Sequence, residues 1–263
     1  MSTEQSNGYS KGASDNSTAN AAMIPEINCD MGEGFANDAQ LMPFIQAANI
    51  ACGYHAGDET TMWETVKLAL QYKVSIGAHV SFLDRENFGR SEIRLPPEDV
   101  YELVLQQLLI LQEIVSSFDT SIRHVKPHGA LYNMSAQDPS LAAAIARAIK
   151  DFDHQLVLYG LSGSHSIEEA KKIGLATRQE VFADRSYQDD GRLTSRQLPG
   201  ALITDPERAW QQVLQMIKRG NVTTLSGKII PVVAETICIH GDGEQALPIL
   251  QRIHEGLKQT VHT

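Results

Sequence analysis

The chain has little cysteine, and none of it is spaced as in a metal or redox motif. Its three cysteines are Cys29, Cys52 and Cys238, and no two of them form a C-x-x-C pair. All three fall in segments predicted as strands, so we interpret them as small buried apolar residues of a protein kept in a reducing compartment. We therefore expect a cytoplasmic location, and nothing indicates a disulfide framework or marks a cysteine nucleophile.

Long apolar runs and excess positive charge are absent as well. No window approaches the roughly 18 consecutive apolar residues of a membrane span, so no membrane partner is expected. The chain carries 22 Lys and Arg against 32 Asp and Glu, which gives a formal net charge of −10. A nucleic-acid partner needs a basic patch and is not expected either. The composition, 42% hydrophobic and 21% charged, is typical of a soluble globular protein.

The first 22 residues differ in composition from the rest of the chain. They are rich in Ser, Asn, Thr and Ala, and they lack the apolar segment of a secretory signal. We expect residues 1–22 to form a disordered tail. No linker-like stretch interrupts the remainder, so residues 23–263 are expected to form one domain.

Predicted strands and helices alternate along the chain. The expected strands are Glu26–Asp30, Asn49–Cys52, Val74–His79, Ile122–Val125, Leu156–Tyr159, Thr177–Phe182 and Thr236–Ile239. Helices are expected after an N-cap at Asp58 or Thr60, from Pro97 to Ser116, after the cap-and-proline pairs Asp138-Pro139 and Asp205-Pro206, over Ser166–Ile173 and over Gln245–Leu257. This α/β alternation predicts a seven-stranded (β/α) barrel, and a doubly wound open sheet is the second choice.

Charged and titratable residues follow the ends of nearly all the predicted strands. In parallel α/β folds these ends share one face, where ligands bind. Any one of these residues is compatible with a structural role, but their joint placement predicts an active site on that face. The set consists of Asp30, Glu33, His55, Asp58, His79, Lys126, His128, Asp184, Arg185, His240 and Asp242. The unusually long loop Val80–Leu95, which carries Arg85, is typical of a lid or binding segment.

These residue types support two kinds of chemistry. An Asp–His pair can act as a general base, and Lys126 and Arg185 can hold an anionic group or a developing oxyanion. Three histidines with Asp30 can equally ligate a divalent metal, with Asp30, His55 and His79 as the first candidates. No H-E-x-x-H motif occurs, so the spacing does not choose between metal-dependent and metal-free catalysis.

Nucleotide-binding motifs are mostly missing. No G-x-x-x-x-G-K-[ST] sequence occurs. The segment Gly241–Ala246 matches G-x-G-x-x-A, but too little chain follows it for the second half of a dinucleotide-binding unit. We interpret this match as coincidental for NAD, although the following helix N-terminus is suited to an anion.

Several segments resemble those of the LamB/YcsF family of "lactam utilization" proteins, also known as the A component of 5-oxoprolinase, from Ile24 to about Leu257. They are INCDMGEGF, NIACGYHAGD, GAHVSFLDRENFGR, VKPHGALYN, EVFADRSY, DDG with PGALI, and ICIHGD. The resemblance implies an irregular seven-stranded (β/α) barrel similar to the glycoside hydrolase/deacetylase group. Val80 and Leu83 stand where the family usually has proline, which affects the shape of the Val80–Arg90 loop more than the chemistry.

By resemblance, the activity is the ATP-dependent opening of 5-oxo-L-proline to L-glutamate, with ATP as co-substrate and with two partner subunits, B and C. We expect catalytic roles for Asp30, His55, His79, Lys126, His128 and Asp184. Substrate-binding roles are expected for Glu33, Asp58, Arg85, Arg185, His240 and Asp242. The need for a divalent metal stays open. The alternatives are a metal-dependent amide hydrolase or deacetylase on a related barrel, and a non-catalytic regulatory partner protein.

Overall fold

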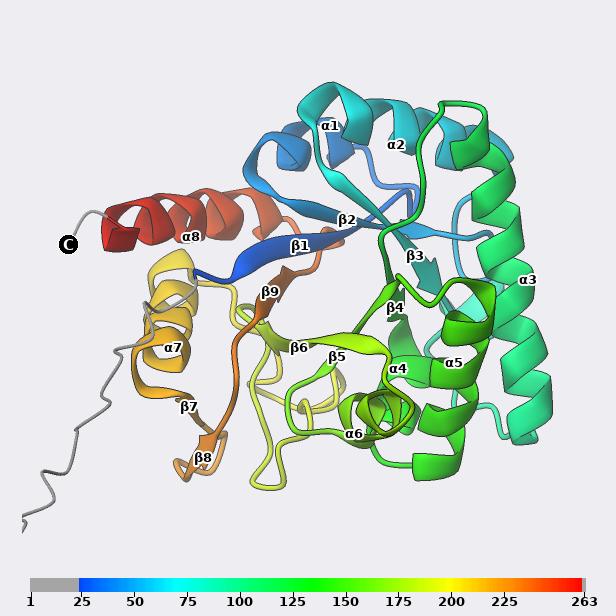
Figure 1. Ribbon diagram of the computed structural model, residues 1–263. Helices are drawn as coiled ribbons and strands as arrows, with labels where there is room; N and C mark the ends of the chain where they lie inside the picture. Colours follow the sequence, from blue (N-terminus) through cyan, green and yellow to red (C-terminus); the bar gives the residue numbers. More distant parts are fainter. Residues whose placement is uncertain (1–23, 262–263) are drawn as a thin grey trace, which may run out of the picture.

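Seven parallel strands close into a barrel in the computed structural model, which describes residues 24–261 (Figure 1). The strands are β1 (Glu26–Met31), β2 (Ala47–Ala51), β3 (Ser75–Val80), β4 (His124–Pro127), β5 (Val157–Leu161), β6 (Ala176–Phe182) and β9 (Thr236–Ile239). They follow one another in this order, and β9 pairs with β1 in parallel to complete the ring. The predicted seven-stranded barrel is confirmed, and the open sheet is wrong. The tail expected over residues 1–22 lies outside the described residues.

Helices surround the barrel (Figure 1). They are α1 (Asp38–Leu41), α2 (Glu59–Tyr72), α3 (Pro97–Ser116), α4 (Gly129–Ser135), α5 (Pro139–Phe152), α6 (His165–Lys172), α7 (Pro206–Arg219) and α8 (Ala246–Val261), with 3-10 turns at Met42–Phe44 and Arg85–Asn87. The carboxylates of Asp58, Asp138 and Asp205 accept hydrogen bonds from the first turns of α2, α5 and α7, as their capping positions predicted. Among the described residues, no helix is both long and apolar enough to cross a bilayer.

One short helix and one pair of short strands were not predicted. Helix α4 begins directly after His128, and its seven residues are too few to show a helical period. An antiparallel pair, β7 (Asn221–Thr223) and β8 (Ile229–Pro231), lies outside the barrel. Around Asp189–Gly191 the chain makes a turn with one antiparallel bridge, between Tyr187 and Leu193. Short elements of this kind depend on tertiary packing more than on local pattern.

Several inward-facing positions of the barrel carry polar side chains. Side chains two residues apart on a strand share a face, so Asn28 and Asp30 on β1, and His124 and Lys126 on β4, point the same way. The Asn28 amide donates to Glu180 Oε1 at 2.9 Å and to Thr236 Oγ1 at 2.8 Å. Within the ring of strands, buried hydrogen bonds therefore link β1, β6 and β9 below the strand ends.

Gly77 on β3 makes room for one of these polar side chains. The buried His124 ring stacks on Tyr159 with centroids 4.2 Å apart, and its Nε2 lies 2.8 Å from Asn49 Oδ1. A Cβ on Gly77 would lie 2.1 Å from His124 Nε2. Asn49 in turn donates to Asp30 Oδ1 at 2.8 Å, so the space at Gly77 supports a hydrogen-bond chain that ends at a predicted catalytic carboxylate.

We expect Gly77→Ala to destabilise the protein by about 1–3 kcal/mol, because the ring that the methyl group meets is held by stacking on Tyr159 and by its hydrogen bond to Asn49. For a chain of this length, each kcal/mol lowers the melting temperature by about 2–4 °C. Gly243→Ala is the matched control, since its Cβ would meet only Gln245 N, at 4.0 Å. Thermal unfolding of both variants tests this, and equal melting temperatures would show that β3 and β4 absorb the methyl group.

Candidate active site

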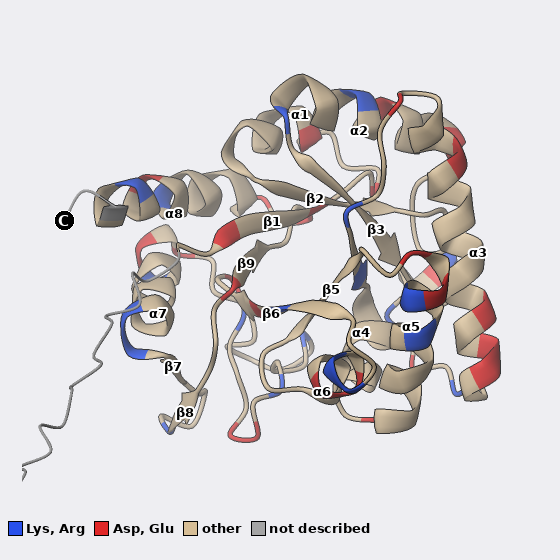
Figure 2. Cartoon of the chain, in the orientation of Figure 1, with Lys and Arg blue, Asp and Glu red and all other residues tan. Residues whose placement is uncertain are grey.

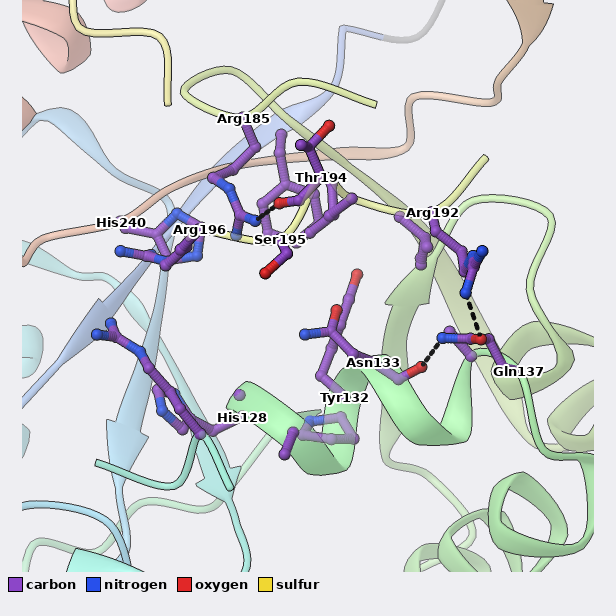
Figure 3. Close-up of a pocket in the computed structure, with 18 of the residues that line it drawn as sticks. His128, Tyr132, Asn133, Gln137, Arg185, Arg192, Thr194, Ser195, Arg196 and His240 are labelled. Carbon is purple, nitrogen blue, oxygen red and sulfur yellow. Dashed lines mark hydrogen bonds between the residues drawn. The ribbon is translucent and has the colours of Figure 1, made fainter. Parts of the chain in front are cut away.

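A pocket of about 690 Å³ opens at the carboxyl ends of the barrel strands. Many of the charged residues lie on the outer helices and loops (Figure 2), but a separate group lines or underlies this pocket. Its walls come from β1, β3, β4, β6, helix α4 and the segment that follows Tyr187 (Figure 3). Ligands bind at this face in parallel α/β folds, so the pocket lies where the strand-end pattern predicted the active site.

Lys126, at the end of β4, is a buried cation that lines the pocket. Its Nζ lies 2.9 Å from Asp30 Oδ1, 3.1 Å from Glu180 Oε1 and 3.0 Å from Cys238 Sγ, and the residue is 2% exposed. Burial alone would lower the pKa of Lys126, but Asp30, Cys238 and Glu180 raise it well above the usual value. Burial opposes the ionisation of Asp30, yet His79 and Lys126 hold its pKa well below the usual range. Asp30 and Lys126 therefore form an ionised pair.

Three histidines surround the Glu33 carboxylate on the other side of Asp30. Glu33 Oε1 lies 3.1 Å from His55 Nε2, 3.4 Å from His128 Nδ1 and 3.8 Å from His79 Nε2. Burial and the charge of Asp30 raise the pKa of Glu33 well above its usual range. Burial lowers the pKa of His55, with help from His79, and that of His128, with help from His55. Within this Glu33–His cluster, Glu33, His55 and His128 therefore disfavour charge, in contrast to the Asp30–Lys126 pair next to it.

The long loop after β3 covers this cluster. Phe88 has a left-handed backbone with φ of 56°, its carbonyl oxygen lies 2.9 Å from His128 Nε2, and its ring packs edge-on against His55. A Cβ on Gly89 would approach both His128 and His55 to 2.9 Å, so only glycine allows the loop to run this close. The loop Val80–Leu95 therefore lies beside the predicted site residues. Its role in binding stays a prediction.

His240, after β9, is held by Asp184. The His240 Nδ1 lies 2.9 Å from Asp184 Oδ2, and the His240 backbone N–H also donates to that oxygen at 3.1 Å. Burial opposes the ionisation of Asp184, but the contact with His240 lowers its pKa. Donation from Nδ1 leaves Nε2 as the nitrogen of the neutral ring that can accept a proton. His240 lines the pocket, so this pair has the geometry of an oriented base.

Arginines form the outer wall of the pocket (Figure 3). Arg90 and Arg196 both donate to Asp242 Oδ2, at 2.7 and 2.9 Å. Arg185 donates to the Thr194 carbonyl, while its buried Nε has no hydrogen-bond partner among the described residues. Burial and the nearby Arg196 lower the pKa of Arg185 to about 10. Two guanidinium groups close together with an unused donor are suited to binding an anion.

The structure brings together all but two of the residues that the sequence singled out. Asp58 is exposed and caps α2, where it accepts from Thr61 N at 2.8 Å. Arg85 is exposed and donates to the Gly53 carbonyl at 3.1 Å. Neither lines the pocket. These two side chains come after strands β2 and β3 in sequence, but the hydrogen bonds that they make are with Thr61 and with the Gly53 carbonyl.

Several site residues were missed from the sequence. Glu180 sits inside a predicted strand, where a lone acidic residue was a usable signal for an inward ion pair. Tyr132 is buried on the unpredicted helix α4, and burial and the nearby Glu180 raise its pKa well above the usual value. Arg90 and Arg196 lie in loops, where nothing in the local pattern shows which way a side chain points.

The metal ligands that the sequence suggested, Asp30, His55 and His79, stay a prediction. Asp30 Oδ1 contacts Lys126 Nζ at 2.9 Å, while Asp30 Oδ2 lies 3.4 Å from His79 Nε2. Two groups of described residues present ligand atoms within 4.8 Å of one another: Glu33, His55, His79 and His128, and Asp30, Cys238 and His240.

Comparison with known proteins gives two kinds of match. The sequence profile of the LamB/YcsF family matches residues 25–263. The crystal structure of the lactam utilization protein from Thermus thermophilus is 39% identical, with a TM-score of 0.84 over 91% of this chain and 98% of that chain. A structure from Enterococcus faecalis V583, provisionally named a cellobiose-phosphate cleavage protein, is 12% identical, with a TM-score of 0.52 over 89% of this chain and 93% of that chain. The second likeness shows the barrel fold alone.

We expect Lys126→Met to destabilise the protein by about 3–5 kcal/mol near neutral pH, because it leaves two buried carboxylates without their cation. In the wild type the lowered pKa of Asp30 contributes stability above the pKa of the unfolded chain. In the variant, the effect of burial on Asp30 is no longer opposed by Lys126, so the pKa of Asp30 rises and folding takes up protons. The deficit relative to the wild type is therefore largest at about pH 7 and smaller at about pH 4.5.

Urea unfolding at both pH values measures this deficit. Lys171→Met, at an exposed position of α6, is the matched control. A deficit that stays constant with pH, or grows as the pH falls, would contradict the ion pair.

Proposed function

The chain belongs to the LamB/YcsF family, and on that premise we propose that it is the A component of a 5-oxoprolinase. In this function, 5-oxo-L-proline is opened to L-glutamate while ATP is hydrolysed to ADP and phosphate. A role in lactam utilization is supported by the family and by the 39% identical Thermus structure. The three buried free cysteines agree with the cytoplasmic location that belongs to this proposal.

The observation that carries the proposal is that guanidinium groups and acid–base groups line the same pocket. Arg185 and Arg196 supply the first, which we call the arginine wall, and Asp30, His79 and His240 supply the second. A lactam acid also has two parts, a carboxylate and a ring amide. We assign the carboxylate, or a phosphate formed from ATP, to the arginine wall. The ring amide then faces the acid–base groups.

The chemistry explains why ATP is needed. A lactam is a stable amide, and phosphorylation of its oxygen with release of ADP makes the ring carbon electrophilic. Water adds to that carbon, the C–N bond breaks to give an acyl phosphate and a free amine, and a second water releases phosphate. The chain contains no P-loop sequence, which agrees with a nucleotide site shared with, or supplied by, subunits B and C.

The residue roles follow from the contacts. Asp184 orients His240 as a base that takes a proton from attacking water. Lys126 was expected to hold substrate oxygens, but its ammonium already contacts Asp30, Glu180 and Cys238. We therefore assign Lys126 to keeping Asp30 ionised beside the ring amide.

A second candidate is a metal-dependent amide hydrolase. The buried Glu33–His cluster favours it, because glutamate and histidine side chains are ligands of catalytic zinc sites. The two functions differ in their need for ATP.

We expect ATP-dependent glutamate release from 5-oxoproline only when this chain is mixed with subunits B and C. In that mixture, Asp30→Asn lowers kcat by about 100-fold or more, the range for loss of an acid–base or electrostatic group. Asp205→Asn is the matched control, because asparagine can still cap α7 and this position does not line the pocket. An assembled but inactive mixture, or full activity with Asp30→Asn, would contradict the proposal. Hydrolysis without ATP would favour the second candidate.

We also expect Arg185→Lys to reduce selectivity for the substrate carboxylate. Lysine keeps the charge but loses the planar fork that binds two oxygens. The measurement compares kcat/KM for 5-oxoproline with kcat/KM for 2-pyrrolidinone, the same ring without its carboxylate. Arg185→Lys lowers the first value by about 10-fold or more and changes the second much less. Arg208→Lys, exposed on α7, is the control. An equal loss on both substrates would show that Arg185 does not contact the carboxylate.

A further inference from the structure

Two histidine rings, those of His79 and His128, face each other at the pocket. When both rings are neutral, neither of the two facing nitrogens carries a hydrogen. His79 Nδ1 lies 2.9 Å from the Lys126 carbonyl oxygen, and His128 Nε2 lies 2.9 Å from the Phe88 carbonyl oxygen. A carbonyl oxygen only accepts, so both of these nitrogens donate. In each neutral imidazole the other nitrogen then carries a lone pair. These other nitrogens, His79 Nε2 and His128 Nδ1, are 2.9 Å apart.

With both rings neutral, two lone pairs at this distance repel each other unless a cation lies between them. Asp30 Oδ2, which lies 3.4 Å from His79 Nε2, also attracts a positive charge to this position. That cation is either a proton shared by the rings or a metal ion. Glu33 Oε1 completes a triangle with the two nitrogens, at 3.4 Å from His128 Nδ1 and 3.8 Å from His79 Nε2. Ligand atoms about 2.0–2.2 Å from a tetrahedral zinc ion lie roughly 3.3–3.6 Å from one another. The three observed separations bracket that range.

We propose that Glu33, His79 and His128 bind a divalent transition-metal ion, with zinc as the best match to two imidazoles and one carboxylate. The ring planes of His79 and His128 meet at 87°, so one ion can lie in the plane of both. The His55 ring stacks on His128, with centroids 3.8 Å apart and planes 9° apart. An ion in the plane of one of these two rings is out of the plane of the other. His55 therefore stays outside the ligand set and contacts Glu33 at 3.1 Å.

The surroundings favour a metal over a proton. Both ligand rings are fixed from behind by backbone carbonyls, which is the usual way in which a protein sets the tautomer of a metal-binding histidine. One of these carbonyls belongs to Phe88, which holds a left-handed backbone conformation to reach His128. His79 and His128 line the pocket, so an ion bound here has an open side toward it. Such an ion would polarise a carbonyl oxygen placed in the pocket.

A second group of possible ligands is less suitable. Asp30, Cys238 and His240 also present ligand atoms within 4.8 Å of one another. However, Lys126 Nζ already contacts Asp30 at 2.9 Å and Cys238 at 3.0 Å. A cation therefore occupies that position without a metal. This difference provides a control within the same pocket.

The first test measures metal binding by the purified chain alone. After chelator treatment, the protein is dialysed against Zn²⁺, Mn²⁺ or Co²⁺, and bound metal is counted by mass spectrometry. We expect one tightly held Zn²⁺ per chain. Because loss of an outer-shell partner alone costs about 10–100-fold, Glu33→Gln and His128→Gln should weaken binding by about 100-fold or more. His240→Gln and the exposed His154→Gln should bind as the wild type does. Circular dichroism checks that each variant is folded.

The second test observes the histidine nitrogens by ¹⁵N NMR. In the metal-bound protein we expect His79 to carry its hydrogen on Nδ1 and His128 to carry it on Nε2, which are opposite tautomers. Addition of one equivalent of Zn²⁺ should shift His79 Nε2 and His128 Nδ1 and leave His154 unchanged.

Two results would overturn the proposal. One is the absence of bound metal together with a hydrogen shared between His79 and His128. The other is metal that is lost in His240→Gln but kept in His128→Gln. Neither test uses ATP or the partner subunits. A negative result here would therefore not contradict the proposed lactam hydrolysis, which the glutamate-release assay tests separately.

Discussion

The buried ammonium of Lys126 is the interaction on which the rest of this site depends. It reaches from β4 to Asp30 on β1 and to Glu180 on β6, so one side chain ties together strands across the barrel. The charges are buried, and removing any one would leave the others uncompensated at a cost of several kcal/mol. Asn28 and Asn49 donate to the same two oxygens that the ammonium contacts, Glu180 Oε1 and Asp30 Oδ1. An ion-pair network therefore forms part of the pocket lining, through Asp30 and Lys126.

From this centre the protein places two carboxylates in opposite states. Asp30 is held ionised by His79 and Lys126, while burial and the charge of Asp30 raise the pKa of Glu33. His79 lies between them, 3.4 Å from Asp30 Oδ2 and 3.8 Å from Glu33 Oε1. Neighbouring acids with pKa values pushed apart are the usual basis for separate acid and base roles in one site. Asp30, with its lowered pKa, pairs with Lys126, whereas Glu33, with its raised pKa, belongs to the histidine cluster that is suited to a metal ion.

Much of the fold could be predicted because its signals are local. The alternation of strands and helices, and the capping aspartates Asp138 and Asp205, require only neighbouring residues and were confirmed. Helix α4 and the β7–β8 pair were not predictable, because their short sequences carry no period and are stabilised by what they pack against. Closure of the ring was a topological inference from strand number, and the pairing of β9 with β1 confirms it.

For the site, the sequence determined which residues meet at one face, because parallel strands put all their carboxyl ends together. It did not determine which way each side chain turns, so Asp58 and Arg85 were included and Arg196 was missed. Nor did it determine the partners: the Lys126–Glu180 pair joins strands far apart in the chain, and the carbonyls that fix His79 and His128 belong to backbone that any residue would supply. Only the tertiary structure sets those contacts, because hydrogen bonds to backbone and ion pairs across a barrel depend on position in space and leave no pattern in the sequence.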